Sequence, residues 1–394
     1  MNSFFASVEQ QENPQLRGKP VGVCPFVGDA TCVIAASYEA KRYGVKTGTN
    51  IAKARRLCPH IQLVENNARL YRDYHRRIMS ALEQTRCQVR VQSIDEALLL
   101  VPRDLLGEGL KLAEEVKNII RTIGSHLQCS VGIASNRFLA KMATNIYKPN
   151  GLIEIKLEDL EGFYSILKLT DLHGISWRMA RRLGSMGIQT PLDFYQAPYS
   201  LLKSRLGVNG ERWYLRLRGY EVDLAVTKRR MIGHQNTIIP RPASTTGEVL
   251  SVASRLTYKA AVRLRASGLA AQSVTVYVRF ADRSYWGKTL KTRSPFFDSS
   301  TFFAHVQKIL AGWSPPRPVR LVSVTATDLI PIQATTLRLF DPTDKAEKLS
   351  EALDEIDLRF GRNTIKPARQ LLGGKIIDQV GFGNAPDTAL ALKS

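Results

Sequence analysis

The sequence predicts an α/β protein of several domains, and three observations support this fold class. Its 394 residues exceed what one ordinary hydrophobic core can organise. Its apolar fraction of 44% is that of a folded protein. Strand-like and helix-like patterns alternate up to about residue 160, short helices separated by glycine turns follow, and long strands come later. A chain patterned in this way combines α/β and helical domains.

The first part of the chain predicts a small sheet with helices on one side. Short apolar runs at 19–24, 33–36 and 129–134 are typical of buried strands, and the periodicity of 67–84 predicts a long amphipathic helix. Met1–Gln10 is helix-compatible. Further helices are expected at 37–43, 49–57, 110–123 and 136–146.

Two adjacent carboxylates, Asp95 and Glu96, lie in the middle of the apolar, strand-like run 91–100. Successive side chains of a strand point to opposite faces, so both can serve one site only where the strand bends or ends in a turn. One interpretation is that the acidic pair simply marks a hairpin turn or an exposed edge. The other is a divalent-metal site, because carboxylate oxygens suit Mg²⁺, which also binds substrate phosphates. A lysine on the tight turn 148–151 would be well placed for such a phosphate.

Between Leu169 and Tyr220, two units in tandem join helices through glycine-containing turns. The first turn precedes a helix that carries Arg178 and Arg181, and the second lies at 206–210. Such units present backbone N–H groups at helix N-termini to DNA phosphates without reading bases. We therefore favour DNA backbone binding over an ordinary helical hairpin with basic solvent faces.

The distribution of charge points to a polyanion. Lys and Arg number 56 against 35 Asp and Glu, a net charge of +21. Between Lys228 and Ile330 there are 16 basic and 4 acidic residues, so this segment alone carries +12. Clustering of this kind most often marks a nucleic-acid surface.

The last third of the chain predicts an open sheet backed by two helices. Residues 226–240 look like a linker. After it we expect helices at 246–266 and 300–310, strands at 273–280, 285–292 and 319–327, a charged helix at 345–359 and a disordered end. The basic side chains along the expected hairpin are Arg279, Arg283, Lys288, Lys291 and Arg293.

Membrane and secreted classes are disfavoured. No apolar run is long enough to cross a bilayer and no signal-peptide pattern follows Met1, so we expect a cytoplasmic protein without a membrane partner. The five cysteines are scattered and never in C-x-x-C spacing, which argues against disulfides and against a zinc site.

Five short motifs, taken in their order, make the sequence similar to a known family. They are Phe4–Glu9, Tyr38–Lys46, Ser93–Glu96, Ser130–Arg137 and Lys148–Gly151. Together they closely resemble the Y-family translesion DNA polymerases, especially the bacterial polymerase IV and V type. The resemblance runs from Met1 to about Arg359.

The resemblance implies a right-hand polymerase with an α+β palm, small fingers, a helix-hairpin-helix thumb and a basic α+β little finger. The implied boundaries are 1–16 and 65–160 for the palm, 17–64 for the fingers, 161–225 for the thumb, 226–231 for a linker, 232–330 for the little finger and 331–394 for a C-terminal tail.

The resemblance also implies the chemistry. Asp95 and Glu96 match the family's catalytic, metal-binding carboxylates, which with two Mg²⁺ ions promote attack of a primer 3′-OH on the α-phosphate of a deoxynucleoside triphosphate. Phe5 matches the steric gate that excludes a 2′-OH, and Phe4 would offer its backbone N–H to the triphosphate. Further matches to triphosphate contacts are Tyr38, Lys41 and Lys148. We therefore expect low-fidelity, template-directed DNA synthesis past damaged bases.

Three positions depart from the family pattern. Lys41 stands where arginine is usual, and exchanging a planar fork for a point charge should weaken bidentate phosphate binding. Ser176 stands where a hairpin glycine is common. The family's first metal-bridging aspartate falls one position before Met1, and the neutral Asn2 is a poor replacement. Either the start is misassigned, or the chain is truncated by its first strand and is a catalytically impaired homologue that acts as a DNA-binding protein.

The tail suggests a protein partner. Residues 336–340 nearly match the sliding-clamp peptide Q-L-x-L-F, with Leu337, Leu339 and Phe340 as its apolar residues, although Thr336 lacks the glutamine amide. Tethering to a clamp would raise the effective concentration at the primer end. The need for a UmuD-like partner, and the choice between a polymerase IV and a polymerase V role, stay open.

Overall fold

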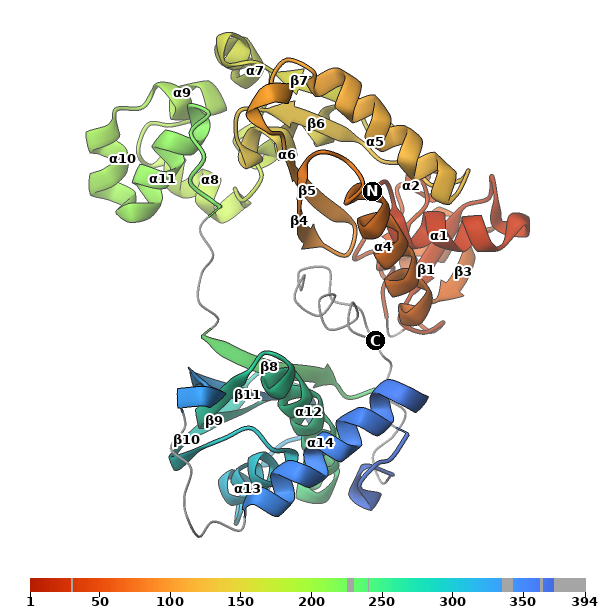
Figure 1. Cartoon of the computed structure of the whole chain (residues 1–394), viewed down its shortest axis with the longest axis vertical. Coiled ribbons are helices and arrows are strands. Elements are labelled where there is room, and N and C mark those ends of the chain that lie inside the picture. Colours follow the sequence, from red (N-terminus) through yellow and green to blue (C-terminus); the bar gives the residue numbers. More distant parts are fainter. Residues whose placement is uncertain (30, 225–229, 240, 335–342, 362–363, 372–394) are drawn as a thin grey trace. The chain divides into compact units, whose positions relative to one another are not determined.

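The structure is a computed structural model that describes residues 1–29, 31–224, 230–239, 241–334, 343–361 and 364–371. The chain divides into two compact units, and the described residues of the first lie within 1–224 and those of the second within 230–371 (Figure 1). No helix in these ranges is long and apolar enough to cross a lipid bilayer. Short 3₁₀ helices lie at Pro14–Leu16, Arg103–Leu105, Leu157–Asp159, Leu169–Asp171, Ile332–Ala334 and Ala368–Leu371.

The first unit begins with helix α1 (Phe4–Glu12), which starts directly after Ser3 in the left-handed conformation (φ 48°). A three-stranded sheet follows in the order β2-β1-β3, with β1 antiparallel to β2 and parallel to β3. Its strands and neighbouring helices are β1 (Val21–Cys24), β2 (Ala35–Ala36), α2 (Tyr38–Arg42), α3 (Ile51–Leu57) and β3 (Gln62–Glu65). The strands and helices expected from the sequence in this region are confirmed.

The acidic run folds as a hairpin. Strands β4 (Gln88–Ser93) and β5 (Glu96–Leu100) are antiparallel, with Ser93 opposite Glu96 and a register irregularity between Val91 and Ser93. Ile94 and Asp95 therefore form the turn. A turn is the arrangement that allows two successive carboxylates to serve one site.

Long helices support this hairpin. Helix α4 (Ala68–Leu82) buries Tyr71, His75 and Ile78, so its apolar face lies in the core as its periodicity predicts. The other elements of this region are α5 (Gly109–Ile123), β6 (Val131–Ala134), α6 (Arg137–Ile146) and β7 (Leu152–Ile155). Strands β6 and β7 form a parallel pair.

The expectation of one small sheet is wrong for the described residues, where the first unit contains three separate sheets. Strands β5 and β6 do not pair with each other there. They line a cavity of about 830 Å³, to which α5 contributes apolar side chains such as Val116 and Ile120. Apolar runs predict that β5 and β6 are strands, but they carry no information on which edges meet.

The rest of the first unit is helical, as its glycine turns predict. Its helices are α7 (Leu160–Ser165), α8 (Trp177–Gly184), α9 (Pro191–Gln196), α10 (Tyr199–Leu206) and α11 (Val208–Leu217). Gly207 links α10 to α11 with φ 61°. A Cβ added at Gly210 would lie 1.9 Å from the carbonyl oxygen of Leu202, so close packing of the two helices requires glycine there.

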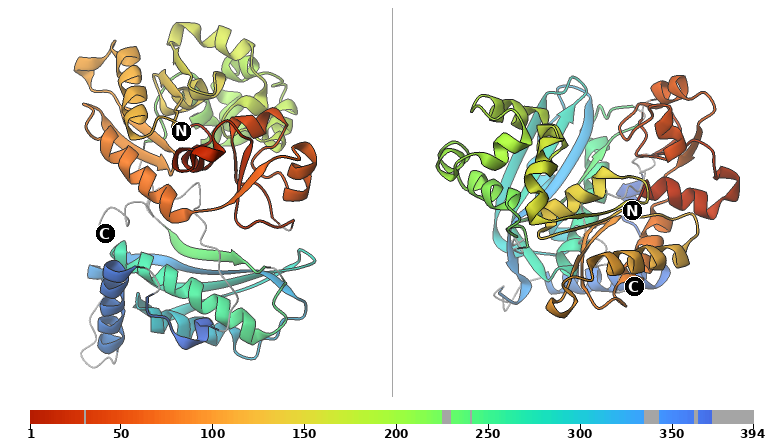
Figure 2. Two further views of the ribbon diagram at one scale, coloured as in Figure 1. Left: turned by 90° about the vertical axis from the view of Figure 1, so that its right-hand side faces the viewer. Right: turned by 90° about the horizontal axis from the view of Figure 1, so that it is seen from above.

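The second unit is an antiparallel four-stranded sheet in the order β10-β9-β11-β8, with helices packed on one face (Figures 1 and 2). Its elements are β8 (Met231–Thr237), α12 (Thr246–Ala266), β9 (Leu269–Phe280), β10 (Tyr285–Phe296), α13 (Ser299–Leu310) and β11 (Val319–Pro331). Val252 of α12 and Phe302 of α13 share a core with Val274 and Val276 of β9. The expected open sheet backed by two helices is confirmed.

One boundary in this region needs correction. The stretch 226–240 resembles a linker in composition, yet β8 occupies 231–237 and pairs with β11 along its whole length. This edge strand is rich in polar residues, and only Ile232 is buried, so its sequence lacks the apolar alternation that marks a strand. Residues 225–229 lie outside the described ranges.

Helix α14 (Thr343–Phe360) returns to the second unit, at the position expected for a charged helix. Asp354 accepts two hydrogen bonds from Arg265 of α12, at 2.7 and 2.8 Å. The side chain of Arg265 is only 8% exposed, and it also donates to the carbonyl oxygen of Phe297. This nearly buried ion pair ties α14 to the sheet-backing helix.

We predict that Asp354→Ala destabilises the second unit by about 2–4 kcal/mol, because it leaves the buried Arg265 guanidinium without its anionic partner. Asp282 offers a matched control, since it pairs with Arg317 in an exposed ion pair and Asp282→Ala should shift the unfolding midpoint far less than Asp354→Ala. Urea denaturation of both variants measures the difference. Equal shifts of the midpoint would contradict this account of α14 docking.

Candidate active site

The turn of the β4–β5 hairpin is held by a set of short hydrogen bonds. The Ser93 hydroxyl lies 2.8 Å from a carboxylate oxygen of Asp95 and donates to it. Nδ1 of His75, on helix α4, lies 2.8 Å from the carbonyl oxygen of Ile94. Burial lowers the pKa of His75, so the imidazole is neutral near pH 7. These bonds fix the backbone from which both carboxylates project.

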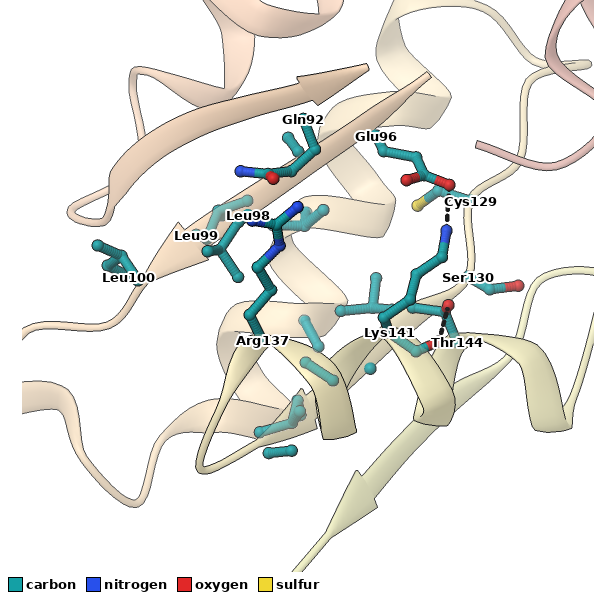
Figure 3. A pocket seen from close by; sticks show the side chains of 18 of the residues that line it. Gln92, Glu96, Leu98, Leu99, Leu100, Cys129, Ser130, Arg137, Lys141 and Thr144 are labelled. Atoms are coloured by element: carbon teal, nitrogen blue, oxygen red, sulfur yellow. Dashed lines mark hydrogen bonds and ion pairs between the residues drawn. The ribbon is translucent and has the colours of Figure 1, made fainter. Parts of the chain in front are cut away.

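Glu96 forms an ion pair with Lys141 of helix α6 across the cavity (Figure 3). Desolvation alone would raise the pKa of Glu96, but the Lys141 ammonium outweighs it and the pKa is lowered. Glu96 is therefore an anion at neutral pH. Gln92 of strand β4 and Arg137 of helix α6 line the same cavity (Figure 3).

The first two residues, Met1 and Asn2, line this cavity. The nitrogen of Met1 donates to the carbonyl oxygen of Asp95 at 2.6 Å, and the backbone N–H of Asn2 donates to the carbonyl oxygen of Gln128 at 2.9 Å. The amino group of Met1 thus lies close to the charges of Asp95 and Glu96. Asn2 itself accepts a hydrogen bond from the backbone N–H of Asn150 at 3.0 Å, so it anchors the lysine-containing turn.

Cations gather beside the start of helix α1. The ammonium of Lys41 donates to the Ser3 hydroxyl at 2.7 Å and lies 4.2 Å from the ring centroid of Tyr38. Desolvation first, and then the charge of Lys141, lowers the pKa of Lys148. The N-terminus of α1 adds backbone N–H groups, including that of Phe4, and its N-cap Ser3 makes no side-chain capping hydrogen bond, so this corner suits a polyphosphate.

Phe5 is fully buried, and its ring stacks on Tyr71 of helix α4 with centroids 4.2 Å apart and planes at 9°. The Tyr71 hydroxyl donates to Glu9 at 2.6 Å. Sequence reasoning missed Tyr71, His75, Lys141 and the anchoring role of Asn2. For Lys141 the sequence carries a signal, because it lies one helical turn after Arg137 in the expected helix; the structure adds that it pairs with Glu96 of the acidic hairpin.

The expected DNA-binding side chains are exposed. Arg178 and Arg181 lie on α8, where Arg178 also stacks near Trp177. Val274 and Val276 of β9 point into the core beneath the helices. Side chains alternate along a strand, so Arg279 of β9, and Lys291 of β10, which pairs with Ser273, lie on the opposite face of the sheet. Arg283 lies in the β9–β10 turn with φ 73°. Residues 335–342, with Leu337, Leu339 and Phe340, lie outside the described ranges.

A metal site can be tested against these donors. Among the described residues, no group of three or more His, Cys, Asp or Glu side chains could hold a metal ion. Asp95 and Glu96 nevertheless fit Mg²⁺ in kind, because this ion uses few protein carboxylates and completes its shell with water and substrate phosphates. The lysines nearby would bind those phosphates rather than the metal.

Comparisons with known proteins agree with this geometry. Residues 1–145 match the impB/mucB/samB family, and residues 229–339 match the C-terminal domain of that family. The chain is 33% identical over 392 residues to DNA polymerase IV of Pelotomaculum thermopropionicum, covering 97% of this chain and 96% of the relative. It is 34% identical over 389 residues to DNA polymerase IV of Moorella thermoacetica, covering 95% and 96%.

Solved structures of the same kind match as well. A Y-family DNA polymerase chimera of Dbh and Dpo4 gives a TM-score of 0.68 at 27% identity, covering 84% of this chain and 97% of the other. The chain belongs to the Y-family of DNA polymerases. An insertion ternary complex of Dbh DNA polymerase gives a TM-score of 0.59 at 28% identity, covering 84% of this chain and 97% of the other.

Family membership confirms the expected α/β multidomain, right-hand polymerase fold and the expected activity of a DNA-directed DNA polymerase that acts in translesion synthesis. The alternative of a catalytically impaired DNA-binding homologue is not favoured, because relatives that match along nearly their whole length are polymerases. Y-family polymerases generally depend on divalent metal ions, which suits the hard oxygen donors at the hairpin turn.

We predict that Phe5→Ala lowers the preference for deoxynucleotides over ribonucleotides by about 10- to 100-fold, because it removes the ring that Tyr71 holds in place. Single-nucleotide incorporation with both sugars measures this ratio. Tyr71→Phe keeps the stacked ring while removing the hydrogen bond to Glu9, so it should leave the ratio unchanged. Unaltered sugar discrimination in a folded Phe5→Ala protein would show that Phe5 is not the gate.

Proposed function

We propose that this chain adds deoxynucleotides to a primer on damaged template DNA, with low fidelity and with two Mg²⁺ ions held at Asp95 and Glu96. The observation that carries the proposal is the position of an acidic hairpin turn beside lysines and a helix N-terminus. When bound, the two ions would supply Lewis-acid stabilisation of the attacking and leaving oxygens.

The protein groups have separate tasks in this proposal. Asp95 and Glu96 provide the anionic oxygens, and the Lys141 ammonium keeps Glu96 ionised. Lys41, Lys148, Tyr38 and the backbone N–H of Phe4 hold the triphosphate and so orient its α-phosphate towards the primer end.

DNA would be held by the exposed arginines and lysines of the thumb and little finger. Arg178 and Arg181 follow a glycine turn at the start of α8, and Arg279, Arg283 and Lys291 follow the β9–β10 hairpin. Such contacts bind phosphates irrespective of sequence, as a polymerase needs to do. We also propose the domain boundaries given above, a cytoplasmic location, and a sliding clamp as partner of Leu337, Leu339 and Phe340.

We predict that Asp95→Asn and Glu96→Gln each reduce Mg²⁺-dependent incorporation by at least about 100-fold, since each removes an anionic ligand where charge develops. DNA affinity should stay within about 2-fold, because neither residue belongs to the DNA surface. Glu154→Gln, an exposed carboxylate on β7, is the matched control. Incorporation by Glu96→Gln at the rate of the parent would refute the assignment.

We predict that Arg279→Ala weakens primer-template binding at all sequences alike and reduces the salt slope of log Kd by about 1, because one phosphate contact is lost. Lys308→Ala removes an exposed cation from α13, on the helix-covered side of the sheet, and should leave the slope unchanged. Fluorescence anisotropy across a salt series measures both. The same slope in both variants would place the DNA surface elsewhere.

A further inference from the structure

A histidine lies beneath the catalytic turn. His75 is on helix α4, its side chain is buried in the first unit, and only 2% of the residue is exposed. Its Nδ1 lies 2.8 Å from the carbonyl oxygen of Ile94. A carbonyl oxygen only accepts hydrogen bonds, so Nδ1 carries the proton and donates it.

This bond is placed where it affects the carboxylates. The Ile94 carbonyl belongs to the peptide group that leads directly into Asp95, and the Ile94 side chain is itself buried. Asp95 is held on its other side, through its own carbonyl oxygen, by the nitrogen of Met1. The peptide before Asp95 and the peptide after it are thus fixed by separate hydrogen bonds.

The Ser93 hydroxyl does not replace the histidine. It donates to the Asp95 carboxylate and accepts a hydrogen bond from the Asp95 backbone N–H at 3.3 Å. Both bonds lie within the hairpin, so they cannot fix its position relative to the rest of the unit. His75 belongs to a different element, a helix of 15 residues packed in the core. It therefore sets the position of the turn relative to the body of the first unit.

We propose that His75 is a positioning residue for the acidic turn: its Nδ1–H holds the Ile94 carbonyl and thereby fixes where Asp95 and Glu96 project. The proposal rests on the function proposed above. The alternative is a purely structural role, in which His75 fills space in the core and its ring nitrogen forms a hydrogen bond that has no effect on the two carboxylates. The positioning role and the structural role predict different activities for a variant that keeps a polar side chain at residue 75 but moves the hydrogen-bond donor away from the Ile94 carbonyl.

Two substitutions separate them. In His75→Asn the amide Nδ2 takes the place of Nδ1, so the donor stays within reach of the Ile94 carbonyl. In His75→Gln the amide nitrogen lies one bond further out, near the former Nε2 position, and the donor at Nδ1 is lost. Both variants bury one neutral amide, so a general penalty for burial affects them similarly.

The experiment compares parent, His75→Asn, His75→Gln and Glu96→Gln. It measures kcat and KM for single-nucleotide incorporation, DNA affinity, thermal unfolding, and Mn²⁺ binding by electron paramagnetic resonance with primer-template and a non-hydrolysable nucleotide present. We expect kcat to fall by about 10-fold or more in His75→Gln and by less than about 3-fold in His75→Asn, because a lost hydrogen bond of this kind leaves a buried carbonyl unpaired. Mn²⁺ affinity should fall in parallel, while DNA affinity and KM stay near the parent values.

The outcomes are distinguishable. Equal losses in both His75 variants that follow the thermal midpoint, or no loss in His75→Gln, would overturn the positioning role. Absence of incorporation by the parent, or full activity of Glu96→Gln, would instead overturn the proposed function. Mn²⁺ binding still decides the His75 proposal in that case, since unchanged affinity in His75→Gln counts against it.

Discussion

The structure of the site depends on a tight turn between two strands. Neighbouring side chains of a regular strand face opposite ways, so Asp95 and Glu96 can act together only because β4 ends at Ser93 and β5 begins at Glu96. The register irregularity between Val91 and Ser93 contributes to the same arrangement, because such irregularities change the direction of side chains and are common near functional sites. Hydrogen bonds from Ser93, His75 and Met1 then keep the turn in place.

The charges around this turn would suit the polyanionic substrate that we propose. Lys141 pairs with Glu96. The pKa of Lys148 is lowered by desolvation and by the charge of Lys141, while the charges of Glu96 and Asp95 raise it, so these acidic and basic groups lie close together. Lys41 extends the positive region to the start of α1. Two carboxylates attract cations and the surrounding lysines attract phosphates, which is the combination that a metal-assisted nucleotide transfer requires.

Much of the fold could be predicted from the sequence because the signals are local. The amphipathic helix α4, the helix α12 and the long strands β9 and β10 all carry clear periodicity. The separation of β5 from β6 could not be predicted, since edge pairing depends on contacts far apart in the chain. The edge strand β8 escaped notice because its side chains are mostly polar.

The site divides in the same way. Asp95, Glu96, Lys41 and Lys148 stand out through ordered motifs, and the structure brings them to one region of the first unit. Tyr71 and His75 lie on a helix whose pattern is explained by core packing alone, so nothing in the sequence marks them as supports of the site. Asn2 is similar, because its contacts to Ser130 and Asn150 join segments more than one hundred residues apart.

The most direct test of the central claim is to measure metal binding at the turn. A Mn²⁺ titration by electron paramagnetic resonance, with primer-template and a non-hydrolysable deoxynucleotide present, would compare the chain with Asp95→Asn. The account predicts nucleotide-dependent Mn²⁺ binding that weakens by about 10-fold or more in the variant, because a charged oxygen ligand is lost. Binding of equal strength in both proteins would contradict the assignment of the hairpin turn as the metal site.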